Sequence, residues 1–578
     1  MSRRPPKRIS AQQATRLILE LDTDDEDIDD IANSEEEVID HPDTEIETTY
    51  EITEDEPIDT EIPAPSHREE ISSEYVGKSG RVWSKTPPPP SRTRAENIFR
   101  GRSGPTVTTQ SKTEAFDLFL SSDMRRDIIR FTNKHGSNDP KWYNIDELEF
   151  DAFMGLLILF GVTKGNHENV RDAWSDGPLA RPIFKATMSI NRFESILRHI
   201  RFDESDTRQS RRQTDKFAPF RDMWQKFTQN CKSHFDPGVN LCIDEQLIPF
   251  RGRCSFRQYL PSKPDKYGLK IFLLVDCDTG YMYDGIPYTG AAQDSTRTCG
   301  LASKITKDLL CNLYNTGRNV TADNYFTDFD LAAELLRKRL TYVGTVRKNK
   351  RDLPVEFQAD KDRPVGSSCF GFDQNTTIVS YVPKRNKSVI LMSTMHHDDK
   401  VDETTGKPDI ILFYNHTKGA VDTVDQLCHS YSVQRKTRRW PLAYFFNMLN
   451  LVGINAFIVF VKSLPLWNAS SLSRRKKFLT ELGMELTGPY VERRKQTLTG
   501  VQRPIQHAMA VCANAEEHAG PTDEVGLPTT SLKSSRKRCH RCARDRKASR
   551  TCHRCNRTVC AEHSLKREEI TCTEDCAI

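Results

Sequence analysis

The stretch VNLCIDEQLIPFRG, residues 239–252, decides the fold of this chain, because a short apolar run ends there on an acid, Asp244. The residues before Val239 follow a helical hydrophobic period, whereas VNLCID alternates as a strand does. Two further acids stand in similar settings downstream, namely Asp323 in NVTADNYFT and Asp422 in KGAVDTVDQ. We expect these three carboxylates to converge, two from strand ends and one from a facing helix.

The segments that follow residue 239 predict a sheet of a particular layout. LKIFLLVD (269–276) and YMYDGIPY (281–288) are expected strands joined by a turn at residues 278–280. NVTAD (319–323) is a short strand, residues 329–340 are a helix, and residues 342–346 are the next strand. Three meander strands followed by a strand–helix–strand unit indicate a ribonuclease H-like sheet within a multidomain α/β protein.

The sheet is interrupted before its third acid. Residues 349–409 contain SSCFGF, TTIVSYV and SVILMST, which we interpret as a mostly β insertion. Asp409 to Tyr414 is expected to return to the main sheet as a strand. A helix from about residue 420 then carries Asp422 and Asp425 at i and i+3, on one face.

Helices are expected on both sides of this region. Stripes of apolar residues predict four helices between residues 113 and 238, one of them at Ile190, Phe193, Leu197 and Ile200 with Arg192, Arg198 and Arg201 facing away. PLAYFFNMLNLVGINAFIVFV (441–461) is uncharged and long enough to cross a bilayer. Three asparagines interrupt it and no second span accompanies it, so a buried core helix is the better interpretation.

The charge of the chain is unevenly distributed. Residues 21–70 hold 22 Asp or Glu and one Arg, a net charge of −21, while the whole chain carries +3, so the remainder carries +24. Residues 1–112 are acidic, lack apolar periodicity and contain PPPP at 87–90, so we expect disorder. A basic body predicts a polyanionic partner such as nucleic acid, although a solvated basic face would look the same.

Three carboxylates that meet in a basic protein are typical of metal-dependent phosphoryl transfer on a nucleic acid backbone. Two Mg²⁺ about 4 Å apart activate the attacking oxygen and stabilise the leaving oxygen. Mg²⁺ prefers oxygen ligands and keeps several waters, so a few carboxylates suffice. Any one of these acids alone would more often be structural, and Asp276, Asp278 and Glu245 are local competitors.

The C-terminal tail predicts bound zinc. Seven of the 16 cysteines fall in the last 40 residues. The spacing gives four ligand pairs, enough for two tetrahedral sites, and too few apolar residues for a core. The expected ligands are Cys539, Cys542, Cys552, Cys555, Cys560, His563, Cys572 and Cys576. The chain opens polar and basic with MSRRPPKR, without a visible signal peptide.

Five longer motifs resemble the piggyBac family of DNA transposases, close to the moth element that gives the family its name. They cover roughly residues 113–464, and the tail is similar as well. The motifs are IDEQLIPFRGRCSFRQYLPSKPDKYGLKIF (243–272), TADNYFTDFDLA (321–332), YVGTVRKNKRDLP (342–354), TGKPDIILFYNHTKGAVDTVDQ (405–426) and RKTRRWPLAYFFNMLNL (435–451).

This resemblance implies a cut-and-paste transposase whose metal triad matches Asp244, Asp323 and Asp422. A fourth family acid matches Asp425, and a tryptophan important for activity matches Trp440. Family members free a 3′-OH that attacks the opposite strand to form hairpins, and they integrate at TTAA sites. The resemblance therefore implies Mg²⁺ or Mn²⁺, double-stranded DNA with terminal inverted repeats, a homodimer and a nuclear location.

The resemblance also divides the chain into domains. It implies a helical dimerisation and DNA-binding domain at 113–238 and 431–500, around a catalytic domain at 239–348 and 410–430. The β-rich insertion occupies 349–409 and the zinc domain 536–578. Residues 501–535, which are punctuated by Pro, Thr and Ser, are an expected linker from their composition. In the family's cross-braced RING/PHD-type pattern, one zinc takes Cys539, Cys542, Cys560 and His563, and the other takes Cys552, Cys555, Cys572 and Cys576. The last pair, Cys-x₃-Cys, departs from the usual spacing.

Basic groups bracket each acid and are candidate phosphate contacts. Any single one is more often a solvated surface group. They are Arg251, Arg253, Arg257, Lys263, Lys266, Lys270, Arg347, Lys348, Lys350, Arg351, Arg435, Lys436, Arg438 and Arg439. RRKK at 474–477 and RKR at 536–538 are candidate nuclear localisation signals. The alternative function is that of a domesticated DNA- or chromatin-binding protein that does not transpose.

Overall fold

The computed structural model describes residues 73–89, 98–176, 180–260, 263, 265–290, 300–496 and 502–517, and four two-residue strands in the tail. The chain divides into two compact units, Met1–Cys512 and Ala513–Ile578. The tail strands form two antiparallel pairs. They are β14 (Lys537–Arg538), β15 (Lys547–Ala548), β16 (Arg550–Thr551) and β17 (Thr558–Val559).

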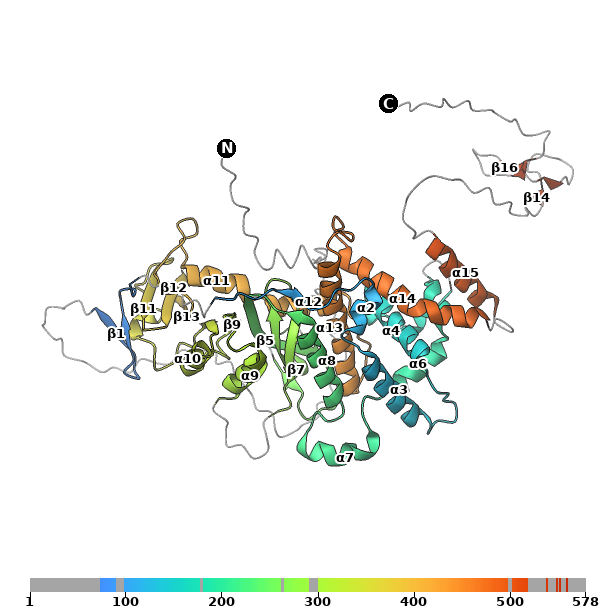
Figure 1. Cartoon of the computed structure of the whole chain (residues 1–578), viewed down its shortest axis with the longest axis horizontal. Helices are drawn as coiled ribbons and strands as arrows, with labels where there is room; N and C mark the ends of the chain where they lie inside the picture. Colours follow the sequence, from blue (N-terminus) through green and yellow to red (C-terminus); the bar gives the residue numbers. More distant parts are fainter. Residues whose placement is uncertain are drawn as a thin grey trace, which may run out of the picture. The chain divides into compact units, whose positions relative to one another are not determined.

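The first unit contains an 11-stranded mixed sheet in the order β1-β2-β11-β12-β13-β10-β9-β5-β7-β6, with β8 paired to β7 (Figure 1). Its strands are β1 (Glu74–Val76), β2 (Val82–Ser84), β5 (Asn240–Pro249), β6 (Gln258–Tyr259), β7 (Tyr267–Asp276), β8 (Met282–Pro287), β9 (Asn319–Ala322), β10 (Thr341–Thr345), β11 (Ser368–Phe372), β12 (Thr377–Lys384) and β13 (Lys387–Ser393). Strands β5, β9 and β10 run parallel, and their neighbours in the sheet pair antiparallel. The predicted meander and strand–helix–strand unit are therefore both present.

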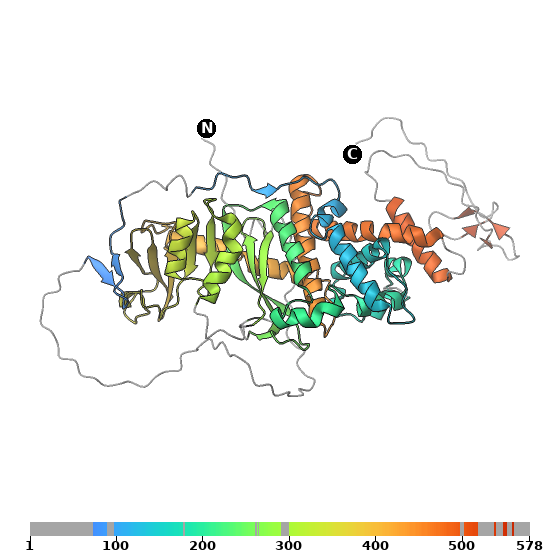
Figure 2. The ribbon, with the colours of Figure 1, turned by 60° about the horizontal axis from the view of Figure 1, so that its bottom comes forward.

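Helices cover both faces of the sheet. Successive residues of a strand point to opposite faces, so neighbouring residues pack against helices on different sides. Tyr342 of β10 packs into the main core, which contains residues of α10 (Phe329–Arg337). Its neighbour Val343 packs into a smaller core with Ile410 and Tyr414 of α11 (Asp409–Thr417). Helix α12 (Ala420–Ser430) packs on β5 and β7, and α9 (Leu301–Leu310) packs on β7 and β8 (Figure 2).

The helical part of the unit is built from segments on both sides of the sheet sequence. Helix α4 packs along α14, and their glycines Gly155 and Gly483 meet so closely that a Cβ on Gly155 would lie 2.8 Å from the Gly483 carbonyl oxygen. The helices are α2 (Lys112–Asp117), α3 (Ser122–Gly136), α4 (Glu147–Val162), α5 (Pro182–Thr187), α6 (Ile190–His199), α7 (Ser205–Thr214), α8 (Arg221–His234), α13 (Trp440–Ser463), α14 (Arg474–Gln496) and α15 (Arg503–Glu517). A short pair, β3 (Gly104–Pro105) and β4 (Phe235–Asp236), lies outside the main sheet.

Helix α13 is the long apolar segment of the sequence, and its most apolar window is entirely buried inside the protein. Its three asparagines each bond to another element. Asn447 donates to the Gln246 side chain (2.8 Å), Asn450 accepts the Val433 N–H (3.0 Å), and Asn455 accepts the Met282 N–H (3.0 Å). The prediction of a core helix is confirmed, and the asparagines join it to β5, β8 and the segment before α13.

The prediction that residues 1–112 are disordered is wrong for the described part of that range. Strands β1 and β2 form a hairpin that joins the edge of the sheet through the Ser84–Phe372 pair. Trp83 is fully buried and donates its indole N–H to the Asp352 carbonyl (2.9 Å). A composition average over an acidic, proline-rich region hides a short apolar pair such as Val82-Trp83.

Two other segments are helical where the sequence suggested otherwise. Residues 409–414 belong to α11, not to a strand, because Ile410, Ile411, Tyr414 and Thr417 are buried at helical spacing. Part of the predicted linker is α15, whose Ala508, Met509 and Cys512 pack with Ala186 and Val491.

The segment 349–409 contains β11, β12 and β13, in keeping with its interpretation as mostly β, and β13 pairs with β10 so that these strands continue the main sheet. One expected placement differs. Arg192 does not face solvent, because the side chains of Arg192 and Glu149 are each 4% exposed and form a two-bond ion pair at 2.7–2.8 Å.

Candidate active site

The parallel pairing of β5 with β9 brings the first two predicted acids together. The last parallel pair is Ile243 with Ala322, so Asp244 and Asp323 are the next residues on adjacent strands. Neighbouring strands lie about 4.8 Å apart, which makes these two side chains direct neighbours. The expectation that Asp244 ends its strand is wrong, because β5 continues to Pro249 through antiparallel pairs with β7.

Helix α12 supplies the other two acids. Asp422 lies in its first turn and Asp425 one turn later, as the i, i+3 spacing predicts. Asp425 faces β5, where its carboxylate accepts a hydrogen bond from Gln246 Nε2 (3.1 Å). The Asp422 side chain is 67% exposed. Helix α12 therefore adds a half-buried acid, Asp425, and an accessible one, Asp422.

The acids of this cluster carry like charges and are largely shielded from water, so the pKa values of three of them are raised. Burial, together with the nearby charge of Asp323, raises the pKa of Asp244 to about 7. Burial also raises the pKa of Asp323, with Glu245 adding to the effect, and the pKa of Asp425. Such acids ionise more easily when a cation lies between them.

Lys263 already provides one positive charge at this cluster. Its ammonium lies 3.5 Å from Asp422 Oδ1 and 3.3 Å from the Glu245 carbonyl oxygen, and its side chain is only 20% exposed. From the sequence, Lys263 was a candidate phosphate contact. In the structure its ammonium group points to the acids. Lys270 is likewise buried and pairs with Glu245 at 3.4 Å.

The donors at this site suit a hard divalent cation, because they are carboxylate oxygens and the charges of Asp244 and Asp323 repel each other. Within the described ranges, no group of three or more His, Cys, Asp or Glu side chains is close enough together to hold a metal ion as it stands. If Mg²⁺ or Mn²⁺ binds here, the residues that would hold it are Asp244, Asp323 and Asp422.

The predicted phosphate contacts fall into two classes. Arg435 is buried and donates to the carbonyls of Gly165 and Glu168, and Arg439 is half-buried on the carbonyls of Leu197, Arg198 and Ile200. Both arginines donate to backbone carbonyls of other segments of the protein, so their sequence-based interpretation as phosphate contacts is corrected. Lys350 pairs with Asp328 at 2.7 Å. The exposed members are Arg251, Arg253, Arg257, Lys266, Arg347, Lys348, Arg351, Lys436 and Arg438.

Trp440 begins α13 and packs against aromatic neighbours. It is stacked on Phe217 with ring centroids 5.5 Å apart and meets Phe256 edge-on at 5.1 Å. Phe256 belongs to the loop between β5 and β6. Trp440 thus supports the loop that follows the first acid's strand.

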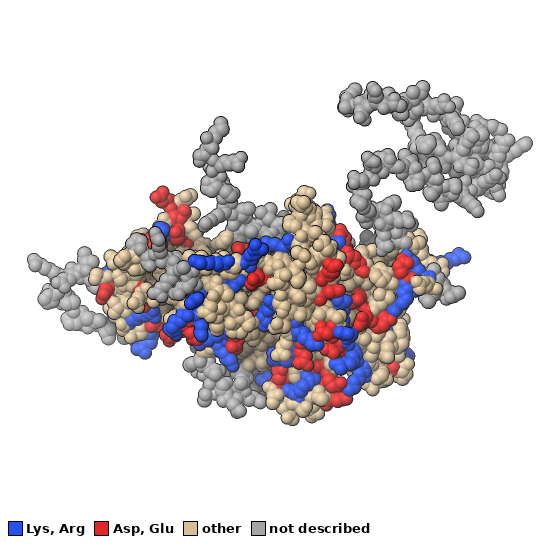
Figure 3. Space-filling model, viewed as in Figure 1, with Lys and Arg blue, Asp and Glu red and all other residues tan. Residues whose placement is uncertain are grey.

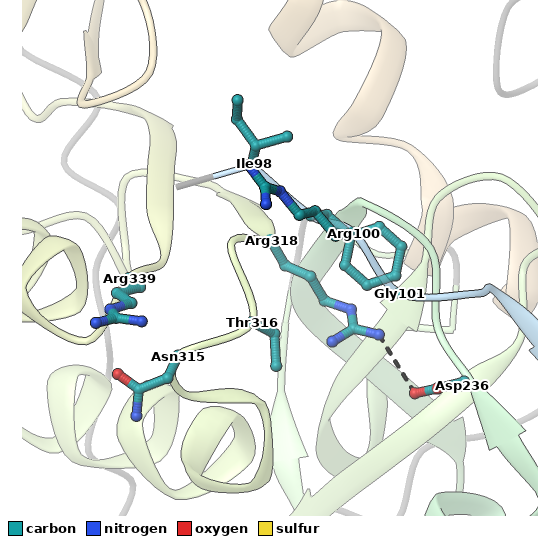
Figure 4. Close-up of a pocket in the computed structure, with 9 residues that line it drawn as sticks. Ile98, Arg100, Gly101, Asp236, Asn315, Thr316, Arg318 and Arg339 are labelled. Atoms are coloured by element: carbon teal, nitrogen blue, oxygen red, sulfur yellow. Dashed lines mark hydrogen bonds and ion pairs between the residues drawn. The ribbon is translucent and has the colours of Figure 1, made fainter. Parts of the chain in front are cut away.

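A separate cavity of about 590 Å³ lies at the other end of β9, away from the acids (Figure 4). Arg318, which directly precedes β9, lines it together with Arg100, Arg339 and Asp236, whereas Asp323 follows the same strand. Arg318 is held by Asp236 at 3.3 Å and by backbone carbonyls. None of the predicted catalytic acids lines this cavity.

Comparison with known proteins agrees with the family resemblance seen in the sequence motifs. The family described as Transposase IS4 matches residues 111–457. A solved piggyBac transposase, in a synaptic complex with hairpin DNA, is 35% identical, with a TM-score of 0.67 over 80% of this chain and 98% of that one. The chain belongs to the piggyBac-type transposases.

Two human relatives of this piggyBac-type chain are more distant. PiggyBac transposable element-derived protein 3 is 23% identical over 361 residues, which are 59% of this chain and 60% of that protein. PiggyBac transposable element-derived protein 5 is 25% identical over 206 residues, or 33% of this chain and 38% of that protein. The chain thus spans less than two thirds of these curated relatives.

Sequence reasoning missed the residues that support the piggyBac-type acids. Gln246 is 1% exposed and links Asp425 to Asn447 of α13. Its position could have indicated this role, because Gln246 lies two residues after Asp244 and therefore on the same face of β5. The eight predicted zinc ligands, Cys539, Cys542, Cys552, Cys555, Cys560, His563, Cys572 and Cys576, lie outside the described residues.

Proposed function

We propose that this chain is a cut-and-paste DNA transposase that excises its element and integrates it at TTAA sites. The observation that carries the proposal is the register that makes Asp244 and Asp323 neighbours, with Asp422 arriving on α12. The 35% identity to a piggyBac transposase in a complex with hairpin DNA supports the same chemistry. In this proposal the sheet is the family's ribonuclease H-like catalytic core.

Asp244, Asp323 and Asp422 hold the divalent ions in this proposal. When bound, Mg²⁺ or Mn²⁺ activates the attacking oxygen and stabilises the leaving one. Burial of Asp244 and Asp323 gives their charges a strong effect on an ion, since little water screens them. Gln246 fixes Asp425 beside the cluster as a hydrogen-bond acceptor.

Exposed basic side chains around the acids would contact the DNA backbone. Arg251, Arg253 and Lys266 follow the first acid, Arg347 and Lys348 the second, and Lys436 and Arg438 the third. Charged side chains of both signs alternate over the helical part of the visible face, so no single-sign surface dominates there (Figure 3). The substrate we propose is double-stranded DNA with the element's terminal repeats, bound by a homodimer in the nucleus.

The C-terminal cysteines and His563 extend this proposal with two structural Zn²⁺ ions and a role in recognising the terminal repeats. The support is the ligand spacing and the 11 Lys or Arg against one Asp within residues 531–557. In the first unit, Arg475 of the RRKK cluster is 2% exposed and donates to the Leu427 carbonyl. This leaves the RKR at 536–538 as the better candidate for a localisation signal.

An excision assay in cells tests the proposal. The wild-type chain and the isosteric variants Asp244→Asn, Asp323→Asn and Asp422→Asn act on a reporter interrupted by the matching terminal repeats and flanked by TTAA. We expect seamless reporter repair with wild type and a loss of at least about 100-fold in each variant. The variant proteins must bind the same ends as wild type.

A domesticated DNA-binding protein is the second candidate, because the human relatives are described as derived from a transposable element. It predicts that wild type binds the ends but leaves the reporter interrupted. Equal inactivity of wild type and all three variants on DNA that they bind would favour this candidate.

A further inference from the structure

Three buried side chains, two on strands of the sheet and one directly after β7, hydrogen-bond to the short segment that joins α11 to α12. Cys242 Sγ donates to the Lys418 carbonyl (3.2 Å), and Cys277 Sγ donates to the Thr417 carbonyl (3.4 Å). Thr321 Oγ1 and Thr417 Oγ1 are hydrogen-bonded at 2.8 Å. Cys242, Cys277, Thr321 and Thr417 are each at most 1% exposed.

Two of these residues, Cys242 and Thr321, precede an acid by the same number of residues along the chain. Cys242 lies two residues before Asp244 on β5, and Thr321 of β9 lies two residues before Asp323, which directly follows that strand. Residues two apart on a strand point to the same face, so Asp244 and Cys242 are both on the side of β5 that faces the segment between α11 and α12. Strands β5 and β9, which position Asp244 and Asp323, therefore also contact the segment from which α12 and its Asp422 begin.

This segment needs such support from the sheet. Helix α12 begins after Gly419, and no side chain caps its N-terminus. Asp422 is the third residue of α12 and its side chain is mostly exposed. The sheet holds the chain at Thr417 and Lys418, five and four residues before Asp422, and so helps to fix where α12 begins.

We propose that Thr321, Cys242 and Cys277 are positioning residues for Asp422, which set its distance from Asp244 and Asp323 for divalent metal binding. This inference rests on the proposed function. It assigns a task to two buried cysteines and a threonine that would otherwise be ordinary core residues. Groups that hydrogen-bond a metal ligand directly typically change metal affinity by about 10- to 100-fold when removed. Thr321, Cys242 and Cys277 act one step further away, through Thr417 and Lys418, so we expect an effect at the lower end of that range.

The test compares Thr321→Val, which removes the hydroxyl and keeps the shape, with Thr321→Ser, which keeps the hydroxyl. Thr417 retains its bond to the Phe413 carbonyl (3.0 Å) in either variant, so the fold is expected to survive. Thr377→Val is the matched control, because Thr377 is 1% exposed in the same sheet and bonds instead to the His396 carbonyl. Cys242→Ala and Cys242→Ser form a second pair with the same logic.

The measurement is the rise in melting temperature of the full chain as Mn²⁺ is added, followed by end-DNA cleavage at the same Mn²⁺ concentrations. We expect Thr321→Val to need about tenfold more Mn²⁺ for half of the stabilisation. Thr321→Ser and Thr377→Val should follow wild type. A Thr321→Val curve that coincides with wild type, or one shifted equally in Thr377→Val, would overturn the inference.

The failure of the proposed function would look different. In that case wild type would gain no stability from Mn²⁺, or the gain would persist in Asp422→Ala. If wild type responds and Asp422→Ala does not, metal binding at the acids holds, and the Thr321 pair then decides the positioning role by itself.

Discussion

At the scale of single residues, the acids could be found from the sequence but their surroundings could not. Asp244, Asp323 and Asp422 stand out because each follows or begins a short apolar segment. Gln246 and Lys263 gain their roles from elements that are far away in the chain, α12 for both and α13 for Gln246. Spacing along one strand could suggest the face of Gln246 but not its partner.

Arg435 and Arg438 are expected to act differently although three residues separate them. Arg435 is buried on two carbonyls and its guanidinium lies 4.3 Å from the ring centre of Phe160, whereas Arg438 is exposed. Arg435→Gln should lower the free energy of unfolding by about 1–3 kcal/mol, because buried acceptors lose their donor. Arg438→Gln should leave stability unchanged and reduce the salt dependence of DNA binding.

Urea unfolding and DNA titrations at several salt concentrations check both expectations. If Arg435→Gln is as stable as wild type and weakens DNA binding by the same factor as Arg438→Gln, the buried role assigned to Arg435 is wrong.

His135 predicts a component of acid sensitivity. Burial and the nearby positive charge of Arg201 lower its pKa to about 4, and its Nε2 lies 2.6 Å from an Arg201 nitrogen. The unfolded chain protonates this histidine near pH 6.5, so the unfolded state binds more protons between about pH 6.5 and pH 4. The stability that depends on neutral His135 is therefore lost as pH falls through that window.

His135→Gln keeps an acceptor for Arg201 and cannot titrate. Chemical unfolding at pH 7.5, 6, 5 and 4 should show the stability of the variant relative to wild type rising as pH falls. A constant difference across these pH values would show that His135 does not titrate in this way.

At the scale of elements, the strands around Asp244 were predicted because their periods are clean and their turn is explicit. The sheet's other half was less visible. Residues 409–414 are apolar and β-branched enough to suggest a strand, and only packing on Val343, Val379 and Leu391 shows why they are helical. The edge hairpin β1–β2 was missed because its partner β11 lies almost 300 residues away.

Trp83 tests whether that hairpin is an integral part of the sheet. It is 0% exposed, packs near Phe329 and bonds to the Asp352 carbonyl. Trp83→Ala should destabilise the first unit by about 3–5 kcal/mol through the cavity it leaves. Val82→Ala is the matched control, because Val82 is 45% exposed and should cost little.

Thermal and denaturant unfolding of both variants give the comparison. Equal stability of Trp83→Ala and Val82→Ala would contradict the close packing of β2 on the core.

At the scale of the whole molecule, the sequence suggested a basic body and a metal-binding tail, and the structure adds that the chain divides near residue 512. The division predicts that the tail can lose its metal without unfolding the rest. We expect two Zn²⁺ per chain by mass spectrometry under native conditions. Chelation should abolish preferential binding to end DNA and leave the melting temperature of the first unit unchanged.

A zinc-free tail that still selects end DNA would contradict this division of labour. Cys539→Ser with Cys542→Ser is the genetic equivalent of chelation, and Cys311→Ser is its control, since Cys311 is an exposed cysteine of the first unit.

The central claim is that Asp244, Asp323 and Asp422 form one metal-dependent centre for DNA strand transfer. The most direct measurement follows purified protein acting on a labelled DNA end that carries the element's terminal repeat and TTAA flank. With Mg²⁺, wild type should give a nick followed by a hairpin, and each Asp→Asn variant should give neither while still binding the end. Hairpins formed by any of the three variants at the rate of wild type, or formed without a divalent cation, would contradict the account.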